Sequence, residues 1–173
     1  MATGKVVLIM ENKPGRIIWH HTADLQYLPQ ADKVNSYHRS LNYPVSSLGF
    51  YGGYHVLIEK DGSTFRYRND NEIGAHDKGE NFNTLGLAMA GNFDVEMPTW
   101  KQEEALAKVV EEWMEKWLIP FSRIEPHRIG DATSCPGKLL SDNWAKIIYI
   151  KHKLSWLQRI LLKLLERLNT KLY

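Results

Sequence analysis

Cysteine is nearly absent from the sequence, which contains one such residue, Cys135, among 173. A single cysteine cannot form an intramolecular disulfide, so we expect packing or a bound metal to stabilise the fold, and a reducing compartment would permit folding. Long hydrophobic runs are missing as well, because none approaches the roughly 18 apolar residues of a membrane-spanning helix. The apolar run at 6–10 is followed by Glu11 and is too short for a signal peptide. We therefore expect the protein to be made in the cytoplasm without a signal peptide.

A strong excess of charge of either sign is also missing. The 22 Lys and Arg residues against 20 Asp and Glu residues give a net charge of +2. Residues 151–173 carry six bases and one acid, a local charge of +5, which leaves 16 bases and 19 acids, or −3, for residues 1–150. A nucleic-acid-binding domain would carry its basic stripe on the body of the domain, so we predict no nucleic-acid partner.

Periodic segments indicate the fold class. Short runs rich in β-branched or aromatic residues occur at 5–10, 16–21, 54–59, 63–68 and 84–91. The Asp-Gly pair at 61–62 predicts a hairpin between the third and fourth runs. Helices are predicted at 29–42 and at 99–118, where Thr99 is a candidate N-cap. This mixture predicts an α/β fold, with a mixed central β-sheet flanked by helices in a single domain over residues 1–150.

The C-terminal segment 151–173 has a different composition. Its leucines at 154, 157, 161, 164 and 168 follow the 3,4,3,4 spacing of an amphipathic helix, and the opposite face is basic. We therefore predict a helical extension of the domain. Three roles stay open for it: packing on the domain core, oligomerisation through a seam of fewer than three heptads, or peripheral contact with an anionic membrane or cell envelope.

The only cysteine lies in the stretch "EPHRIGDATSCPG", together with His127. A hydrolytic zinc site usually has three protein ligands, and these two residues are near enough in sequence to be two of them. The third could come from "RIIWHHTA", where His20 and His21 point to opposite faces of a strand, although alternation alone does not say which one qualifies. Cys135 could instead be a small buried residue, or a nucleophile if the following Pro-Gly pair opens a helix that lowers its pKa.

Four blocks of sequence carry a family resemblance: "IIWHHTA", "GYHVLIEKDGSTFRYR", "GAHDKGENFNTLGLAMAGNF" and "PHRIGDATSCPG". In this order they resemble the zinc-dependent type-2 N-acetylmuramoyl-L-alanine amidases, a family shared by phage endolysins and peptidoglycan recognition proteins. The resemblance covers about residues 15–145. It implies one catalytic zinc ion held by His20, His127 and Cys135.

The resemblance also implies roles for residues around the metal. Tyr54 would lie beside the metal-bound water, and Thr133 would stabilise the oxygen of the attacked carbonyl. The positions that match the substrate groove of the family are His21, Thr22, His38, His76 and Asn83. One position departs from the family: many members carry an acidic residue two positions after the metal histidine, where this chain has Ile129. We therefore expect the metal loop to be held in a different way.

The implied activity is hydrolysis of the amide between the lactyl group of N-acetylmuramic acid and L-alanine in peptidoglycan. A compact chain with a basic amphipathic end favours a phage or prophage endolysin that acts on the cell wall after release. The alternatives are a cytoplasmic amidase that recycles muropeptides, a peptidoglycan-binding protein without catalysis, and a hydrolase with a nucleophilic cysteine.

Overall fold

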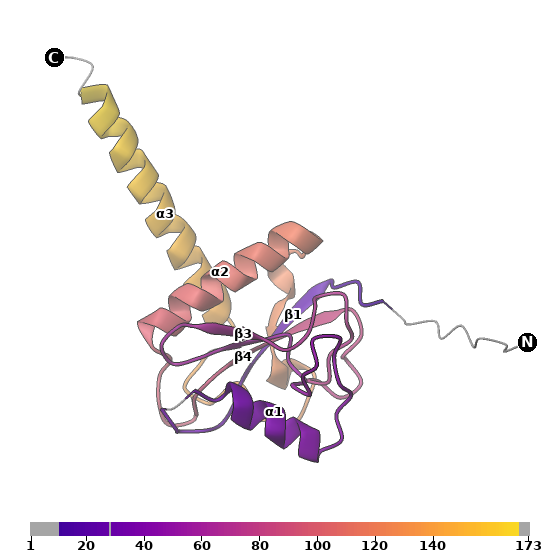
Figure 1. The fold of residues 1–173 in the computed structure, drawn as a ribbon. Coiled ribbons are helices and arrows are strands. Elements are labelled where there is room, and N and C mark those ends of the chain that lie inside the picture. The colour runs from indigo at the N-terminus through magenta and orange to yellow at the C-terminus, as the bar shows by residue number, and fades with distance from the viewer. Residues whose placement is uncertain (1–10, 28, 170–173) are drawn as a thin grey trace, which may run out of the picture.

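The computed structural model describes residues 11–27 and 29–169, and for 159 and 162–169 it describes the backbone alone. These residues form an α/β domain from which one long helix extends (Figure 1). The strand predicted at 5–10 lies outside the described residues.

A mixed sheet of five strands forms the centre of the described part of the chain. In the spatial order β3-β2-β4-β1-β5, its strands are Thr64–Arg66, Val56–Ile58, Thr84–Met89, Arg16–His21 and Ile124–Pro126. Strand β4 runs parallel to both β1 and β2, whereas β3 forms the predicted antiparallel hairpin with β2. The sequence patterns had not predicted the edge strand β5, because its three residues end in proline and are too few to show alternation.

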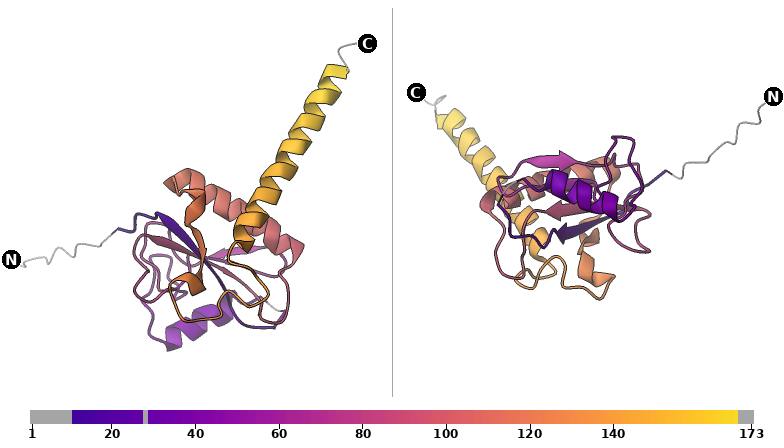
Figure 2. Two further views of the ribbon diagram at one scale, coloured as in Figure 1. Left: turned by 180° about the vertical axis from the view of Figure 1, so that it is seen from behind. Right: turned by 60° about the horizontal axis from the view of Figure 1, so that its bottom comes forward.

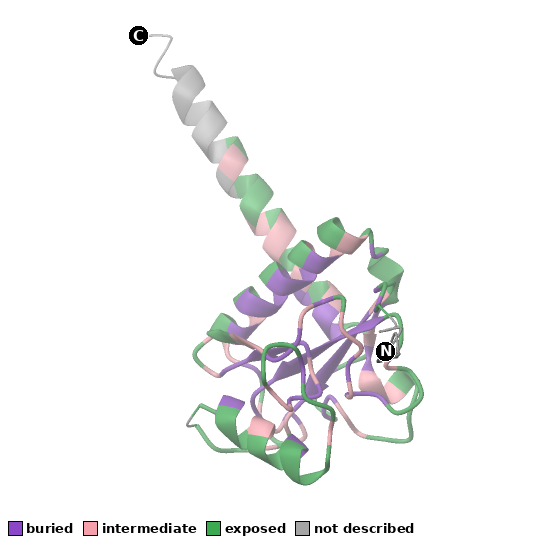
Figure 3. Ribbon diagram, turned by 45° about the vertical axis from the view of Figure 1, so that its right-hand side comes forward, coloured by how far each residue is buried: buried purple, intermediate pink, exposed green. Residues whose placement is uncertain are grey.

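Helices cover the two faces of this sheet. Helix α2 (Trp100–Trp117) and the start of α3 (Trp144–Asn169) pack on one face, and α1 (Ala31–Ser40) lies on the other (Figures 1 and 2). Figure 3 shows the central strands buried between these layers. The mixed sheet flanked by helices agrees with the predicted fold class.

Strand β4 distributes its side chains by size between the two faces. Leu85, Leu87 and Met89 are fully buried in the core under α2 and α3. The alternate positions Gly86 and Ala88 face the α1 side, because successive residues of a strand point to opposite faces. These small residues leave space on the α1 side of the sheet, and the histidines described below occupy part of it.

The N-termini of α1 and α2 are capped in different ways. Thr99 forms the predicted capping box of α2, since its Oγ1 accepts from Gln102 N at 3.2 Å and the Gln102 side chain accepts from Thr99 N at 3.1 Å. At α1 the carboxylate of the residue after β2 serves instead: Glu59 Oε1 accepts from the backbone N–H groups of Gln30 and Ala31, both at 2.8 Å. This long-range cap explains why α1 begins two residues after the predicted start at 29.

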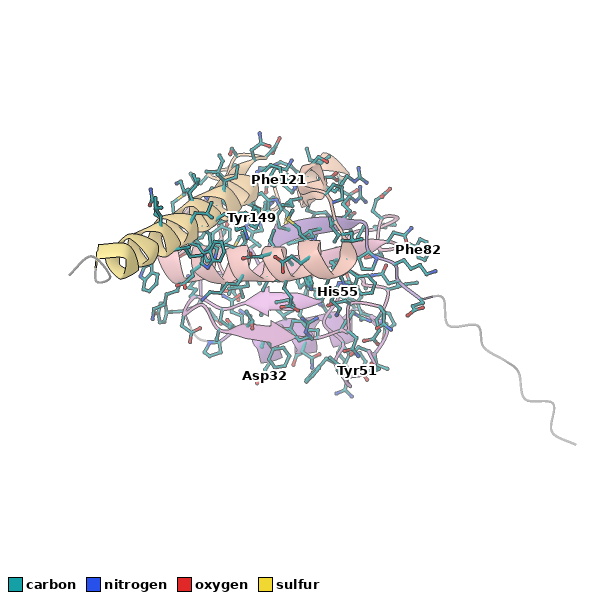
Figure 4. The ribbon with its side chains drawn as sticks, turned by 90° about the horizontal axis from the view of Figure 1, so that it is seen from above. Asp32, Tyr51, His55, Phe82, Phe121 and Tyr149 are labelled. Atoms are coloured by element: carbon teal, nitrogen blue, oxygen red, sulfur yellow. The ribbon has the colours of Figure 1, made fainter. Side chains whose placement is uncertain are left out.

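Helix α3 begins at Trp144 and crosses the predicted boundary at 150/151 without a break. Its first turns belong to the domain core, where the rings of Trp144 and Trp19 lie 5.6 Å apart. Figure 4 shows Tyr149 of this helix beside Phe121, and the two ring centroids are 6.1 Å apart. Farther along, α3 projects away from the domain (Figure 2). None of the helices in the described ranges is long and apolar enough to cross a membrane.

Asp70 joins the loop after β3 to α2. It is 3% exposed and accepts hydrogen bonds from Trp113 Nε1 at 3.2 Å, Trp117 Nε1 at 3.2 Å and Lys116 Nζ at 2.7 Å. Arg66 forms a fourth contact with the same carboxylate. Burial alone would raise the pKa of Asp70, but the hydrogen bonds from Lys116 and Trp117 outweigh it and lower that pKa.

We expect Asp70→Asn to lower the free energy of unfolding at pH 7 by about 2 kcal/mol, because Lys116 and Arg66 lose their counter-charge. Since the folded-state pKa of Asp70 is lowered, its contribution is present above the unfolded pKa of about 3.9 and is lost as the pH falls through the folded value. Urea unfolding curves of the two proteins should therefore converge at acid pH. Asp32→Asn, at an exposed position, is the control, and an equal loss there would contradict the assignment.

Candidate metal centre

Strand β1 carries His20 and His21 to opposite faces of the sheet. Because Ile17 and Trp19 point into the core under α2 and α3, the alternation sends His20 to the α1 side, where it pairs with the small residue Ala88. His20 is 1% exposed. His21 turns the other way, and its Nδ1 accepts a hydrogen bond from Phe93 N at 3.1 Å. Sequence alternation left open whether His20 or His21 could be a ligand. In the structure it is the His20 side chain that faces the other two candidate ligands.

The stretch from His127 to Cys135 brings the other two predicted ligands to His20. His127 begins a short 3-10 turn, His127–Ile129, directly after β5, which pairs with β1. Cys135 Sγ lies 3.7 Å from His20 Nδ1, and the His20 and His127 rings are 4.4 Å apart. One ligand atom from each of the three residues lies within 4.8 Å of the others, so the group can hold a metal ion.

The environment of His127 fits a bound cation. Both of its ring nitrogens are buried and have no hydrogen-bond partner. Its Nε2 lies 3.3 Å from Asp131 Oδ2 and 3.7 Å from Asp77 Oδ1, but neither contact has the geometry of a hydrogen bond. Buried polar atoms without partners are costly, and a metal ion would satisfy them. Two imidazole nitrogens and one thiolate are a ligand set that suits zinc.

His76 orients the ring of His20. Its Nδ1 lies 3.1 Å from His20 Nε2, and its Nε2 lies 3.3 Å from Thr84 Oγ1. Because the Thr84 hydroxyl donates to the Glu80 carbonyl at 2.9 Å, it accepts from His76 Nε2–H. His76 Nδ1 must then accept a hydrogen bond from His20 Nε2–H, which leaves Nδ1 of the neutral His20 ring unprotonated on the side of Cys135. This chain of hydrogen bonds prepares Nδ1 as the ligand atom.

Glycine makes room for His76. A Cβ on Gly86 of β4 would lie 2.5 Å from the His76 ring, and a Cβ on Gly74 would come equally close. Any larger side chain at these positions would displace the ring that His20 needs.

Burial sets the protonation states of the site. It lowers the pKa of His20 well below the ordinary value, and the neighbouring His76 and His127 lower it further. His20 is therefore neutral, as a metal ligand must be. Burial raises the pKa of the Cys135 thiol to about 12. A nucleophilic cysteine needs a lowered pKa, and among the described residues the next helix begins only at Trp144, not at the Pro-Gly pair. Both findings disfavour the nucleophile interpretation.

Arg128 holds the loop that carries Cys135. Its guanidinium donates to the carbonyl oxygens of Gly137, at 3.1 Å, and of Leu140. Its Nε lies 2.8 Å from Asp142 Oδ1, an ion-pair contact that lacks hydrogen-bond angles. Ile129, one residue farther along, is 59% exposed. Asp142 is thus the carboxylate that pairs with Arg128 in this loop.

Tyr54 and Thr133 each lie close to one of the candidate ligands. The Tyr54 ring lies 5.1 Å from the His20 ring, and burial raises the pKa of its phenol far above the ordinary value. The phenol therefore keeps its proton and can donate a hydrogen bond. Thr133 is exposed, and its Oγ1 accepts from Cys135 N at 3.1 Å, so its O–H remains able to donate elsewhere.

The five predicted groove residues do not share one place. His38 is buried near Tyr54, with ring centroids 5.4 Å apart, and His76 lies under His20 as described. Thr22 Oγ1 instead bonds both the N–H and the carbonyl of Gly91. Asn83 is exposed just before Thr84, at the end of β4 opposite to Ala88, which pairs with His20. Substrate contact by these side chains, including His21, stays a prediction.

An open pocket of about 410 Å³ adjoins the candidate centre. Its lining includes His76 and His127 and several residues that sequence reasoning missed, namely Tyr43, Ala75, Asp77, Lys78 and Asn81. Asp77 follows His76 directly in "GAHDKG", but nothing in that stretch predicts that its carboxylate turns toward His127. Of the three candidate ligands, His127 lines this pocket.

The chain belongs to the family described as N-acetylmuramoyl-L-alanine amidase (Amidase_2), whose model matches residues 10–138. Its fold is similar to that of an endolysin amidase of Clostridium intestinale, LysCS, with a TM-score of 0.67 and 31% identity over 79% of this chain and 83% of that one. It is likewise similar to Drosophila PGRP-LB, with a TM-score of 0.66 and 23% identity over 82% of this chain and 83% of that one, which shows the fold alone.

In sequence the chain is similar to peptidoglycan-recognition protein SC2 of Drosophila melanogaster, with 29% identity over 120 residues. The match covers 68% of this chain, and the chain spans 65% of the length of that relative. The human N-acetylmuramoyl-L-alanine amidase is 29% identical over 96 residues, which are 52% of this chain and 16% of that protein.

The hydrogen-bond chain to His20 can be tested with a matched pair of substitutions. Thr84→Val removes the hydroxyl that fixes the tautomer of His76, and we expect zinc affinity to fall about tenfold. Thr84→Ser keeps the hydroxyl and should bind zinc as the wild type does. Competition with a chromophoric chelator measures both affinities, and equal values for the two variants would argue against the tautomer assignment.

Proposed function

We propose that this protein is a zinc-dependent N-acetylmuramoyl-L-alanine amidase that hydrolyses the bond between the lactyl group of N-acetylmuramic acid and L-alanine. The group formed by His20, His127 and Cys135 carries the proposal, and membership of the amidase family supports it. A zinc ion held there would polarise the scissile carbonyl and activate a water molecule near neutral pH.

The protein's own residues would supply orientation and hydrogen bonds. Tyr54 is protonated over the physiological pH range, so it acts as a donor that positions the attacking water rather than as a general base. The Thr133 hydroxyl donates to the carbonyl oxygen as negative charge develops on it. His20 stays neutral and fixed by His76 throughout, and the proton that the attacking water gives up is taken by the amine as it leaves.

A phage or prophage endolysin is the biological role that we favour. Similarity to the endolysin amidase of Clostridium intestinale supports it, as does the basic amphipathic end of the chain. Such a protein would be made in the cytoplasm and act on the cell wall after release. A muropeptide-recycling amidase would instead prefer soluble anhydro-muropeptides to intact cell walls, so the relative rates on the two substrates separate these roles.

Several peptidoglycan recognition proteins are similar to this chain, and a binding protein without catalysis is the second candidate. The presence of all three metal-binding side chains favours the enzyme. Purified protein with stoichiometric zinc should release new amino termini from peptidoglycan. Binding without release would support the second candidate.

Removal of the metal distinguishes the zinc enzyme from a cysteine nucleophile. We expect exhaustive chelation to abolish the release of amino termini and added Zn²⁺ to restore it. Cys135→Ala should lose both zinc and activity, because one of three ligands is gone. The opposite pattern would assign the thiol as the nucleophile: the wild type would stay active after chelation, and Cys135→Ala would be inactive.

Two conservative substitutions test the proposed donors. Tyr54→Phe and Thr133→Val should each lower kcat by about 10²-fold while the zinc content stays stoichiometric, because each removes one hydroxyl donor. Thr133→Ser keeps the donor and is the control, with kcat expected within a few-fold of the wild type. A rise in KM alone, with kcat unchanged, would place these residues in substrate binding instead.

A further inference from the structure

Helix α3 carries an exposed apolar seam, which we define as Ile147, Ile150, Leu154, Leu157 and Leu161. These side chains are 44%, 45%, 55%, 52% and 58% exposed. Their 3,4,3,4 spacing, at about 100° per residue, keeps them within an arc of roughly 80° along one side of the helix. The start of α3 at Trp144 adds the first two isoleucines to the leucine pattern that the sequence alone indicated.

The domain does not cover this seam. Trp144, Ala145 and Ile148 are the α3 residues buried in the core, and their mean direction on the helix is about 150° from the seam. Figures 1 and 2 show the distal part of α3 extending away from all other elements. The domain and the seam therefore lie on opposite sides of the helix. Core packing explains the first turns of α3 but not its apolar seam.

Lysines border the seam on both sides. Lys146 and Lys153 lie roughly 60–80° from its centre on one flank, and Lys151 lies about 80° away on the other. Lys153 also contacts Glu111 of α2, which ties this side of α3 to the domain. From position 151 onward the sequence has six bases and one acid, while the backbone stays helical to Asn169. An apolar stripe with basic borders is typical of a helix that lies on a bilayer of anionic lipids.

A second copy of the chain is a poorer partner for the seam. The sequence continues the spacing at Leu164 and Leu168, so a seam from Ile147 reaches three heptads, which is long enough for a coiled coil. The positions that flank such a core include Lys146, Lys151 and Lys153 beside the uncharged Gln158 and Ile160, however, so like charges would face one another across the first turns of the pair. Anionic headgroups accept all of these charges without repulsion.

We propose that the seam of α3 binds the surface of an anionic lipid bilayer, with the helix lying in the interface. The lysines reach the headgroups while the isoleucines and leucines enter the upper acyl region. The domain, on the opposite side of the helix, stays in the aqueous phase. The surface is separate from the metal centre and does not depend on catalysis.

Sedimentation of the full-length protein with vesicles tests this proposal. We expect binding to equimolar phosphatidylglycerol and phosphatidylcholine vesicles to be at least tenfold tighter than binding to phosphatidylcholine alone, and to weaken as salt rises. Leu154→Ser combined with Leu157→Ser should reduce binding to the anionic vesicles by tenfold or more. Lys146→Gln combined with Lys151→Gln should reduce binding to the anionic vesicles by a smaller factor than the leucine pair, in proportion to the lost charge. Equal binding to both kinds of vesicle, or none, would overturn the proposal.

Trp156→Ser is the matched control, because Trp156 is 49% exposed on α3 but lies about 140° from the centre of the seam. It should bind anionic vesicles within about threefold of the wild type, whereas an effect as large as that of the leucine pair would overturn the assignment of the face. Circular dichroism and zinc content confirm that each variant is folded. Light scattering without lipid measures the oligomeric state. If the wild type is a dimer and the leucine substitutions convert it to a monomer, the seam is a dimer interface and the bilayer proposal is wrong.

Discussion

The parallel pairing of β1 with β4 is the constraint on which the rest of the structure depends. It places His20 opposite Ala88, on the face where β4 carries only small residues, while the large residues of both strands fill the core on the other face. The space left beside Gly86 admits the His76 ring, and that ring fixes the tautomer of His20. The candidate metal centre thus depends on the small side chains that β4 carries on this face, because they leave the space that the histidines occupy.

Local sequence pattern correctly predicted those helices and strands whose signals lie within their own residues. The capping box at Thr99 and the run of β-branched and aromatic residues in β1 are such signals, and both the helix and the strand appear where they were expected. Strand β5 and the capping of α1 by Glu59 depend on partners far along the chain, so neither leaves a local pattern. Where α3 begins, Trp144 packs against Trp19, a contact that is likewise distant in sequence.

In the candidate site, too, some residues could be predicted from the sequence and others could not. Family resemblance pointed to His20, His127 and Cys135, and the structure places their ligand atoms together. The residues that organise these three could not be predicted, because their roles follow from geometry. Thr84 acts through its hydroxyl on His76, and Asp142 pairs with Arg128 from beyond the loop that it stabilises.

The continuity of α3 has a mechanical consequence. The helix is anchored in the core by Trp144 and Ile148 and extends as one element of 26 residues, about 39 Å long at 1.5 Å per residue. A flexible tether would let the domain rotate freely around its attachment point. A continuous helix instead transmits torque, so any surface that holds its distal turns also sets the height and the tilt of the domain, as a rigid strut does.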